Sequence, residues 1–265
     1  MTPETAATNV QASENSGEIA NWITLFYHKW HGVPWVDFLH RWENVFFAWL
    51  FGLAFLIFAV RVKKNIECLT FSQNLFELFA QKISDLFMNV LGEHGKKHIP
   101  FVGTLFIFIL LDNWMGIVPG FKSPTSSLNT TIGLALVVFF YVQFVGLREN
   151  GLWGYIYHFM GSPKELVEWF LVPLNFPLHI LQELIKPVSL SLRLFGNISG
   201  EDALLAAFVV LGIGLGSFLH LPVGVPIQLP FMLLSLLLGA VQALVFSFLA
   251  AIYITLMFSH EEEHS

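Results

Sequence analysis

Long apolar stretches, separated by short polar segments, make up most of the chain. Five of them have about the length of a membrane span, at approximately residues 45–60, 99–118, 128–147, 178–219 and 231–258. A helix needs about 20 consecutive apolar residues to cross the hydrocarbon core of a bilayer. A helix also satisfies its own backbone hydrogen bonds, as lipid requires. The pattern predicts an all-α membrane protein with about five transmembrane helices.

One further stretch, residues 67–90, has the periodicity of a surface helix. Its apolar side chains recur every three or four positions, at Phe71, Leu75, Leu78, Phe79, Ile83, Leu86, Phe87 and Val90. Polar side chains fall between them, at Glu77, Gln81, Lys82 and Asp85. This spacing predicts an amphipathic helix that lies on the cytoplasmic membrane surface or against a partner helix.

Basic residues predict the orientation of the chain in the membrane. Arg61, Lys63 and Lys64 directly follow the first apolar stretch, and basic flanks mark the cytoplasmic side. The N-terminus is therefore expected outside and the C-terminus in the cytoplasm. On this topology nine of the 13 Lys and Arg residues lie inside, three lie outside, and Arg193 lies within a span.

Two stretches are less regular than the others. Residues 151–176 are aromatic but interrupted by Gly161, Pro163 and Pro173, and Pro177 follows them, which predicts a pair of interfacial or shallow re-entrant helices. Residues 178–219 would form a helix of roughly 60 Å, about twice the hydrocarbon thickness. We expect that helix to be strongly tilted, or broken near residues 196–200, with Pro187 bending it or breaking it.

A single arginine lies near the middle of this long stretch. Inserting an arginine into hydrocarbon costs about 3 kcal/mol on insertion scales, so Arg193 must face protein, water or a partner charge. At about 100° per residue, one helix face carries Ser189, Arg193, Asn197 and Gly200, and it is extended by His179, Glu183, Lys186 and Glu201. Asp202 falls on the opposite face.

A purely structural interpretation of the same residues stays open. Arg193 could form an ion pair with Glu183 or with Glu201. Ser199 could cap the start of a new helix whose first turn carries the acids Glu201 and Asp202, since acidic groups favour a helix N-terminus.

Composition supports a membrane protein and excludes several other classes. The chain is 55% hydrophobic and only 12% charged, with 28 Phe and 8 Trp, which is more apolar surface than a soluble core of this length needs. The net charge of −6 argues neither for nucleic acid nor for an acidic substrate. The single cysteine, Cys68, rules out a disulfide scaffold. The first 20 residues lack the features of a cleaved signal peptide.

Two further sequence motifs match known patterns, and neither predicts a catalytic site. Residues 260–264 read His-Glu-Glu-Glu-His, which matches a zinc-protease pattern, but they lie at the end of the chain without a pocket or a third ligand. Gly212 and Gly216 form a small-residue face that suits helix packing. We therefore expect no metal and no cofactor.

The residues around Arg193 carry a long and specific resemblance. Residues 187–197 read Pro-Val-Ser-Leu-Ser-Leu-Arg-Leu-Phe-Gly-Asn, which resembles the signature of subunit a, also called subunit 6, of rotary F-type ATP synthases. The likeness extends over about residues 34–263. It implies that Arg193 is the stator arginine facing a ring of c subunits, with Asn197 and Gln242 as polar neighbours, and that the last two helices form a tilted hairpin against that ring.

The resemblance also implies a path for protons in two offset half-channels. Its outer part would use Glu201, Asp202, Gln242 and Asp112, and its inner part His179, Gln182 and Glu183, with Ser189 beside Arg193. Three departures from the family pattern redistribute this chemistry. Two adjacent acids, Glu201 and Asp202, stand where relatives have one, and Ser235 stands where some have a histidine. On the inner side His179, with Glu183 one turn on, stands where some have a glutamate.

The same resemblance implies partners and a compartment. The partners would be the c-subunit ring and b-type peripheral stalk subunits, in a bacterial inner membrane. The sequence lacks a phosphate-binding glycine loop, so the chain is expected to be a non-catalytic subunit that leaves ATP chemistry to others. We divide it into a polar segment at residues 1–32, one membrane domain at residues 33–259 and a cytoplasmic tail at residues 260–265.

Two alternatives come from other functional classes. A self-contained secondary ion transporter would be favoured by an inverted internal repeat, and the sequence has none. A structural membrane anchor would be favoured if Arg193 could be replaced without loss of coupled transport.

Overall fold

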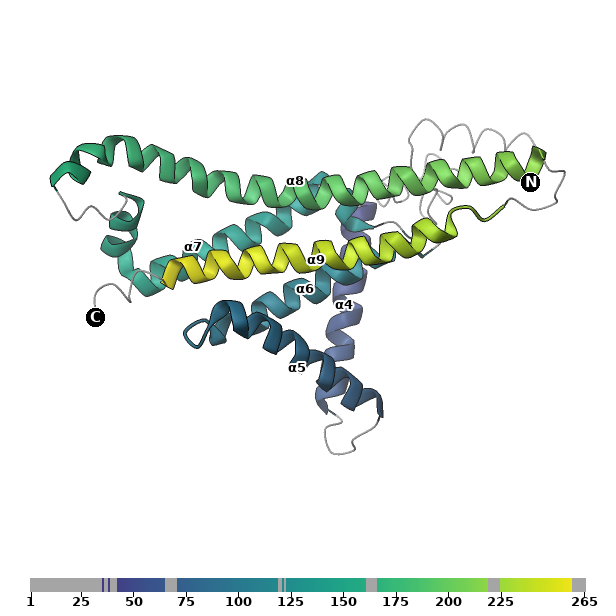
Figure 1. Cartoon of the computed structure of the whole chain (residues 1–265). Helices are drawn as coiled ribbons and strands as arrows, with labels where there is room; N and C mark the ends of the chain where they lie inside the picture. The colour runs from purple at the N-terminus through teal and green to yellow at the C-terminus, as the bar shows by residue number, and fades with distance from the viewer. Residues whose placement is uncertain are drawn as a thin grey trace. The chain divides into compact units, whose positions relative to one another are not determined.

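The protein is helical throughout the part of the chain that the computed structural model describes, which comprises residues 35, 38, 42–64, 71–118, 121, 123–160, 166–218 and 225–258. Its helices, labelled in Figure 1, are α4 (Glu43–Lys64), α5 (Phe71–Leu91), α6 (Ile99–Met115), α7 (Leu128–Phe159), α8 (Leu166–Phe218) and α9 (Leu229–Phe258). Two short 3₁₀ helices, η1 (Lys96–His98) and η2 (Pro124–Ser126), precede α6 and α7.

Four helical segments are long and apolar enough to cross a membrane: Lys96–Met115, Leu128–Tyr155, Val172–Phe218 and Leu229–Phe258. They correspond to four of the predicted spans. Helix α4 covers the predicted first span, and its 22 residues extend about 33 Å. The prediction of an all-α membrane protein is confirmed.

The chain divides into two compact units, and helices α6 to α9 each contribute to both. Unit 1 contains Met1–Arg61, Phe108–Thr130 and Leu194–Ala243. Unit 2 contains Val62–Ile107, Thr131–Arg193 and Leu244–Ser265. Each of the polar groups described below lies within a single unit.

The predicted amphipathic helix is confirmed as α5, which packs against helices of its own chain in unit 2. Its residue Phe87 is fully buried, and the ring lies 6.2 Å from that of Phe106 on α6 and 5.4 Å from that of Phe248 on α9. The Thr255 hydroxyl of α9 donates to the carbonyl of Val90, at 3.2 Å. Polar residues such as Gln81 are exposed.

Helix α7 runs further than the sequence predicted. It continues past residue 147 to Phe159, with a sharp kink at Gly151, whose φ of 66° lies in the left-handed region. Glycine adopts that conformation without steric cost. The predicted pair of interfacial or re-entrant helices corresponds to the kinked end of α7 and the beginning of α8, and its depth in the membrane stays a prediction.

Helix α8 is continuous over 53 residues, or about 80 Å. Of the two alternatives for this stretch, a strong tilt or a break near residues 196–200, the break is therefore wrong, and the tilt stays a prediction. Pro173, Pro177 and Pro187 all lie inside it. Each proline removes one backbone hydrogen bond, whereas ending a helix in lipid would leave several groups unpaired. The interpretation of Ser199 as a helix cap is also wrong, because Ser199 lies within α8 and its hydroxyl donates to the carbonyl of Ser126, at 3.2 Å.

Small residues allow close backbone approach in unit 1, as predicted for Gly212. The N–H of Val225 donates to the Gly212 carbonyl at 3.0 Å, which ties the turn before α9 to α8. On α9 the small or polar residues Ser235, Gly239 and Gln242 are buried. The His-Glu-Glu-Glu-His motif, Cys68 and the segment 1–32 fall outside the described residues. The division of the chain into three parts stays a prediction.

Candidate functional site

Arg193 lies on α8, in unit 2, with an exposed side chain. Ser189, one turn earlier, is exposed as well. Among the residues that the structure describes, Arg193 forms no ion pair, so the structural interpretation that pairs it with Glu183 or Glu201 is not supported. Its positive charge interacts with the Tyr253 hydroxyl of α9, which also belongs to unit 2.

The two amides expected near the arginine are in direct contact in unit 1. The Asn197 side-chain amide of α8 donates to the Gln242 side-chain oxygen of α9 at 2.7 Å. Gln242 is only 4% exposed, whereas Asn197 is exposed. The Gln242 side-chain nitrogen is buried without a hydrogen-bond partner in the described part of the chain, so it retains a free donor inside the protein.

The adjacent acids of α8 face different neighbours. Glu201 accepts a hydrogen bond from the Ser235 hydroxyl of α9, and its Oε2 atom is buried without a partner among the described residues. A carboxylate oxygen of Asp202 instead lies beside Gly116, 3.5 Å from where a Cβ atom there would sit. Glu201 therefore belongs to the contact of α8 with α9, and Asp202 to its contact with the end of α6.

Asp112 lies within a buried polar network that also includes the turn before α7. Its side chain is 0% exposed, and both carboxylate oxygens lack a hydrogen-bond partner within the described residues. The Ser123 hydroxyl donates to the Asp112 main-chain carbonyl at 3.0 Å and lies 2.7 Å from the Thr125 hydroxyl. Thr125 donates to the Asn113 side-chain oxygen at 2.7 Å, and the Asn113 nitrogen donates to the Gly239 carbonyl at 3.0 Å.

A second polar group lies in unit 2 around Glu183, which is 9% exposed. Lys186 donates to its Oε1 atom and forms an ion pair with it, and the Gln143 amide of α7 donates to its Oε2 atom at 3.2 Å. Gln143 in turn accepts from the Tyr155 hydroxyl. The Lys186 ammonium lies 5.1 Å from the centre of the Tyr253 ring.

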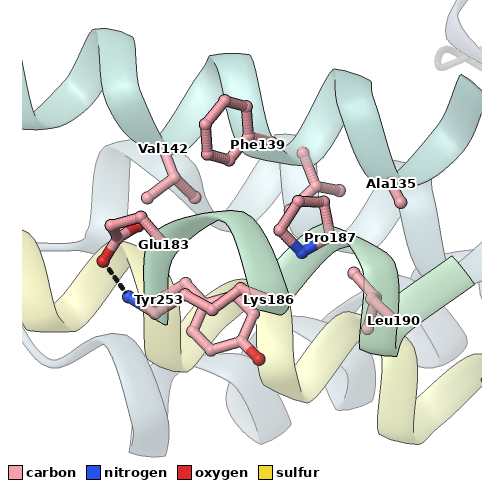
Figure 2. A pocket seen from close by; sticks show the side chains of 9 residues that line it. Ala135, Phe139, Val142, Glu183, Lys186, Pro187, Leu190 and Tyr253 are labelled. Carbon is pink, nitrogen blue, oxygen red and sulfur yellow. Dashed lines mark hydrogen bonds and ion pairs between the residues drawn. The ribbon is translucent and has the colours of Figure 1, made fainter. Parts of the chain in front are cut away.

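Figure 2 shows a cavity beside this group, with Glu183 and Lys186 at one end joined by their ion pair. The cavity is small, with room for about one water molecule. The other lining residues are Ala135, Val138, Phe139, Val142, Pro187, Leu190 and Tyr253. The cavity surface is apolar, so the charged pair borders this space without turning its polar atoms into it.

The structure brings some of the predicted residues together and leaves others apart. Asn197 with Gln242, and Glu201 with Ser235, form contacts within unit 1. Glu183 contacts Lys186 but not the arginine. His179 is half-buried one turn before Glu183, and its predicted role stays a prediction, as does that of every site residue.

Sequence reasoning missed four members of these groups: Ser123, Thr125, Gln143 and Tyr155. Gln143 carried a usable signal, since it is the one amide side chain after Asn129 in the apolar stretch 128–147. The hydroxyls of Ser123 and Thr125 were hidden in a Ser- and Thr-rich segment that resembles an ordinary turn. The residues described here contain no cluster of His, Cys, Asp and Glu suited to a metal ion.

Comparisons with known proteins match most of the chain to one family. A family model described as ATP synthase A chain matches residues 45–255. The chain is 46% identical to an ATP synthase subunit a of Protochlamydia amoebophila over 248 residues, which cover 93% of this chain and 91% of the relative. It is 38% identical to an ATP synthase subunit a of Geobacter sulfurreducens over 223 residues, covering 84% and 89% respectively.

Proposed function

The chain belongs to the ATP synthase A chain family, and from this premise we propose that it conducts protons through two offset half-channels that meet a rotating ring of partner subunits. As a family member it is an integral component of the membrane sector of ATP synthase. The half-channels, the ring contact and the roles of individual residues are the content of the proposal.

The observation that carries the proposal is the exposed guanidinium of Arg193. It lies in a helix long and apolar enough to span a membrane, where exposure to lipid would cost about 3 kcal/mol or more. Without an acid of its own within the described chain, Arg193 must face water or a negative charge from another subunit. An ionised carboxylate on a ring of c subunits would supply that charge.

The polar groups on either side of Arg193 support two separate access routes. Along the axis of α8, Glu183 lies ten residues before Arg193, or about 15 Å, and Glu201 lies eight residues after it, or about 12 Å. Together these distances approach the hydrocarbon thickness of about 30 Å. Each route would thus reach roughly half-way, and neither alone would cross the membrane.

In this mechanism a proton enters by the route that contains Asp112, Glu201, Asp202 and Gln242. It neutralises a ring carboxylate, which can then move through lipid, because only the neutral form has a low cost there. After most of a turn the proton leaves by the route that contains His179 and Glu183. Arg193 stabilises each ring carboxylate in its ionised form as it passes and repels protons that would leak directly between the routes.

The remaining expectations follow the same premise. The chain would be a non-catalytic stator, bound to the c-subunit ring and to b-type peripheral stalk subunits. It would lie in a bacterial inner membrane with its N-terminus outside, which the basic residues after the first span support. A membrane potential supplies about 2.3 kcal/mol per charge per 100 mV, which sets the work available at each step.

The test replaces Arg193 by Ala or Gln in the assembled enzyme and measures ATP-driven proton pumping in inverted membrane vesicles. Both variants should abolish pumping while the ring still co-purifies. Arg148→Ala is the matched control, because Arg148 is an exposed arginine at the end of the span in α7 and should pump normally. Normal pumping by the Arg193 variants would reject the proposal and favour a structural anchor.

A further inference from the structure

Both carboxylate oxygens of Glu183 are held by side chains, and the arrangement involves three residues to which the proposed mechanism gives no role. Lys186 binds Oε1 and Gln143 binds Oε2, while Tyr155 binds Gln143. We propose that Glu183 is the proton-exchanging group of the inner half-channel and that Lys186, Gln143 and Tyr155 are positioning residues that hold its carboxylate. This inference rests on the proposed function and specifies the chemistry of one of its routes.

Tyr155 determines which way the Gln143 amide faces. A side-chain amide presents an oxygen acceptor on one side and an NH₂ donor on the other. The Tyr155 hydroxyl donates to the oxygen, so the NH₂ group is left to donate to Glu183, at 3.2 Å. Without the tyrosine the amide could turn its oxygen towards the carboxylate, and the two acceptors would repel. Tyr155 thus orients the Gln143 amide towards Glu183.

Lys186 holds the other oxygen from the same helix. The two residues are three positions apart on α8, a spacing that brings side chains together on a helix surface. Their side chains are 22% and 11% exposed. A mostly buried ion pair adds little to stability compared with apolar residues of the same size, and the rest of this cavity is lined by such residues. The pair is therefore better explained by charge chemistry than by packing.

Pro187 adds a further acceptor at the same place. Because proline has no N–H, it cannot donate to the main-chain carbonyl of Glu183, four residues earlier, as an ordinary residue would. Glu183 and Pro187 both line the cavity (Figure 2). The Glu183 carbonyl therefore lacks its usual helix donor, directly beside a carboxylate that Lys186 and Gln143 hold.

The proton transfer itself is simple to balance. The Glu183 carboxylate takes a proton from a hydronium that has received it from the ring side, so one O–H bond breaks at the hydronium and one forms on Glu183. Release to water on the inner side reverses both changes and restores the ion pair with Lys186. Since Glu183 lies about 15 Å along α8 from Arg193, direct transfer from a ring carboxylate at the arginine is excluded, and water must carry the proton between them.

The test compares variants in the assembled enzyme by proton conductance of membrane vesicles stripped of the ATP-hydrolysing sector. Glu183→Gln should lower conductance at least tenfold, and the neutral double variant Glu183→Gln with Lys186→Met should be as low, because no proton acceptor remains. Lys186→Arg, which keeps the charge, should retain conductance. If the pair were only structural, the double variant would recover, and that result would overturn the inference.

The positioning residues are tested by combining variants. Tyr155→Phe and Gln143→Leu should each lower conductance about threefold to tenfold, and together no further than Gln143→Leu alone, since the tyrosine acts through the amide. In the Glu183→Gln background neither should have any additional effect. Additive losses, or an unchanged conductance in Tyr155→Phe, would contradict the assignment. If Glu183→Gln fails to assemble, the Tyr155 and Gln143 combination alone decides.

Two controls separate this inference from the proposed function. The ion pair between Lys97 and Glu149, also in unit 2, is more exposed, at 53% and 23%, and the variant Lys97→Met with Glu149→Gln should conduct normally. Pumping that persists in Arg193→Ala would reject the proposed function. If Arg193 proves essential but the neutral Glu183 and Lys186 double variant conducts normally, only the present inference fails.

Discussion

The contact between α8 and the turn before α9 predicts that replacing Gly212 by alanine lowers the stability of the protein. In unit 1 a Cβ atom added at Gly212 would lie 2.3 Å from the main-chain oxygen of Val225, and the Val225 N–H donates to the Gly212 carbonyl at 3.0 Å. Gly214, two residues further along α8, has nothing within 4 Å of the same position. Gly212→Ala and Gly214→Ala therefore form a matched pair on one helix.

The expected magnitudes follow from these contacts. Both variants gain up to about 1 kcal/mol because alanine is a better helix former than glycine. Gly212→Ala must also displace backbone rather than a flexible side chain, which costs about 1–3 kcal/mol, and it weakens a hydrogen bond worth about 1 kcal/mol. Gly212→Ala should thus lose about 1–3 kcal/mol of stability, while Gly214→Ala should be neutral or slightly stabilised.

Thermal unfolding of the purified protein in detergent, followed by tryptophan fluorescence, measures the difference. For a chain of this size 1 kcal/mol corresponds to roughly 2–4 °C in the midpoint temperature, so the two variants should differ by several degrees. Equal midpoints would show that the close approach of Val225 to Gly212 does not hold this turn against α8.

Three other contacts give predictions of the same kind. Asn197→Leu and Gln242→Leu should each reduce proton pumping. A double-mutant cycle of unfolding in detergent should give a coupling free energy of about 0.6 kcal/mol, the mean for hydrogen bonds within membranes. The absence of any coupling would contradict the 2.7 Å contact between the two side chains. Tyr141→Phe should lower the unfolding midpoint by the equivalent of about 1 kcal/mol, because His98 loses its 2.7 Å partner in a buried site; an unchanged midpoint would refute this. Thr125→Val should lower the free energy of unfolding by about 1–3 kcal/mol in the same assay. The reason is that the buried Asn113 side-chain oxygen would lose its hydrogen-bond donor. A smaller loss of stability would mean that this oxygen has another donor.

The positions of the helices could be predicted from the sequence because lipid imposes a simple requirement on chain length and polarity. The apolar stretches at 99–118 and 231–258 correspond to α6 and α9 within a few residues. The interruptions were harder to interpret, because Pro173 and Pro187 break a soluble helix but not this one. Their local cost is the same in both settings, whereas the cost of exposing unpaired backbone groups is far higher in lipid.

The partners of the candidate residues depended on packing that no spacing rule contains. Glu201 and Asp202 are adjacent, yet one reaches Ser235 and the other lies beside Gly116. Only the arrangement of three helices in unit 1 distinguishes them. Gln143 belonged to a different apolar stretch from Glu183, so its 3.2 Å contact required knowledge of which face of α7 meets α8.

The continuity of α8 gives the arrangement of charges a simple geometric basis. Glu183 and Glu201 are 18 residues apart, which is five full turns at about 100° per residue, so they share one side of the helix. Arg193 lies about 80° away from that side. This offset agrees with the side chains, because Glu183 is buried and Glu201 half-buried while Arg193 is exposed. A break in the helix between them would have removed this relation. An unbroken helix can therefore expose its arginine while it keeps both acids against its own chain.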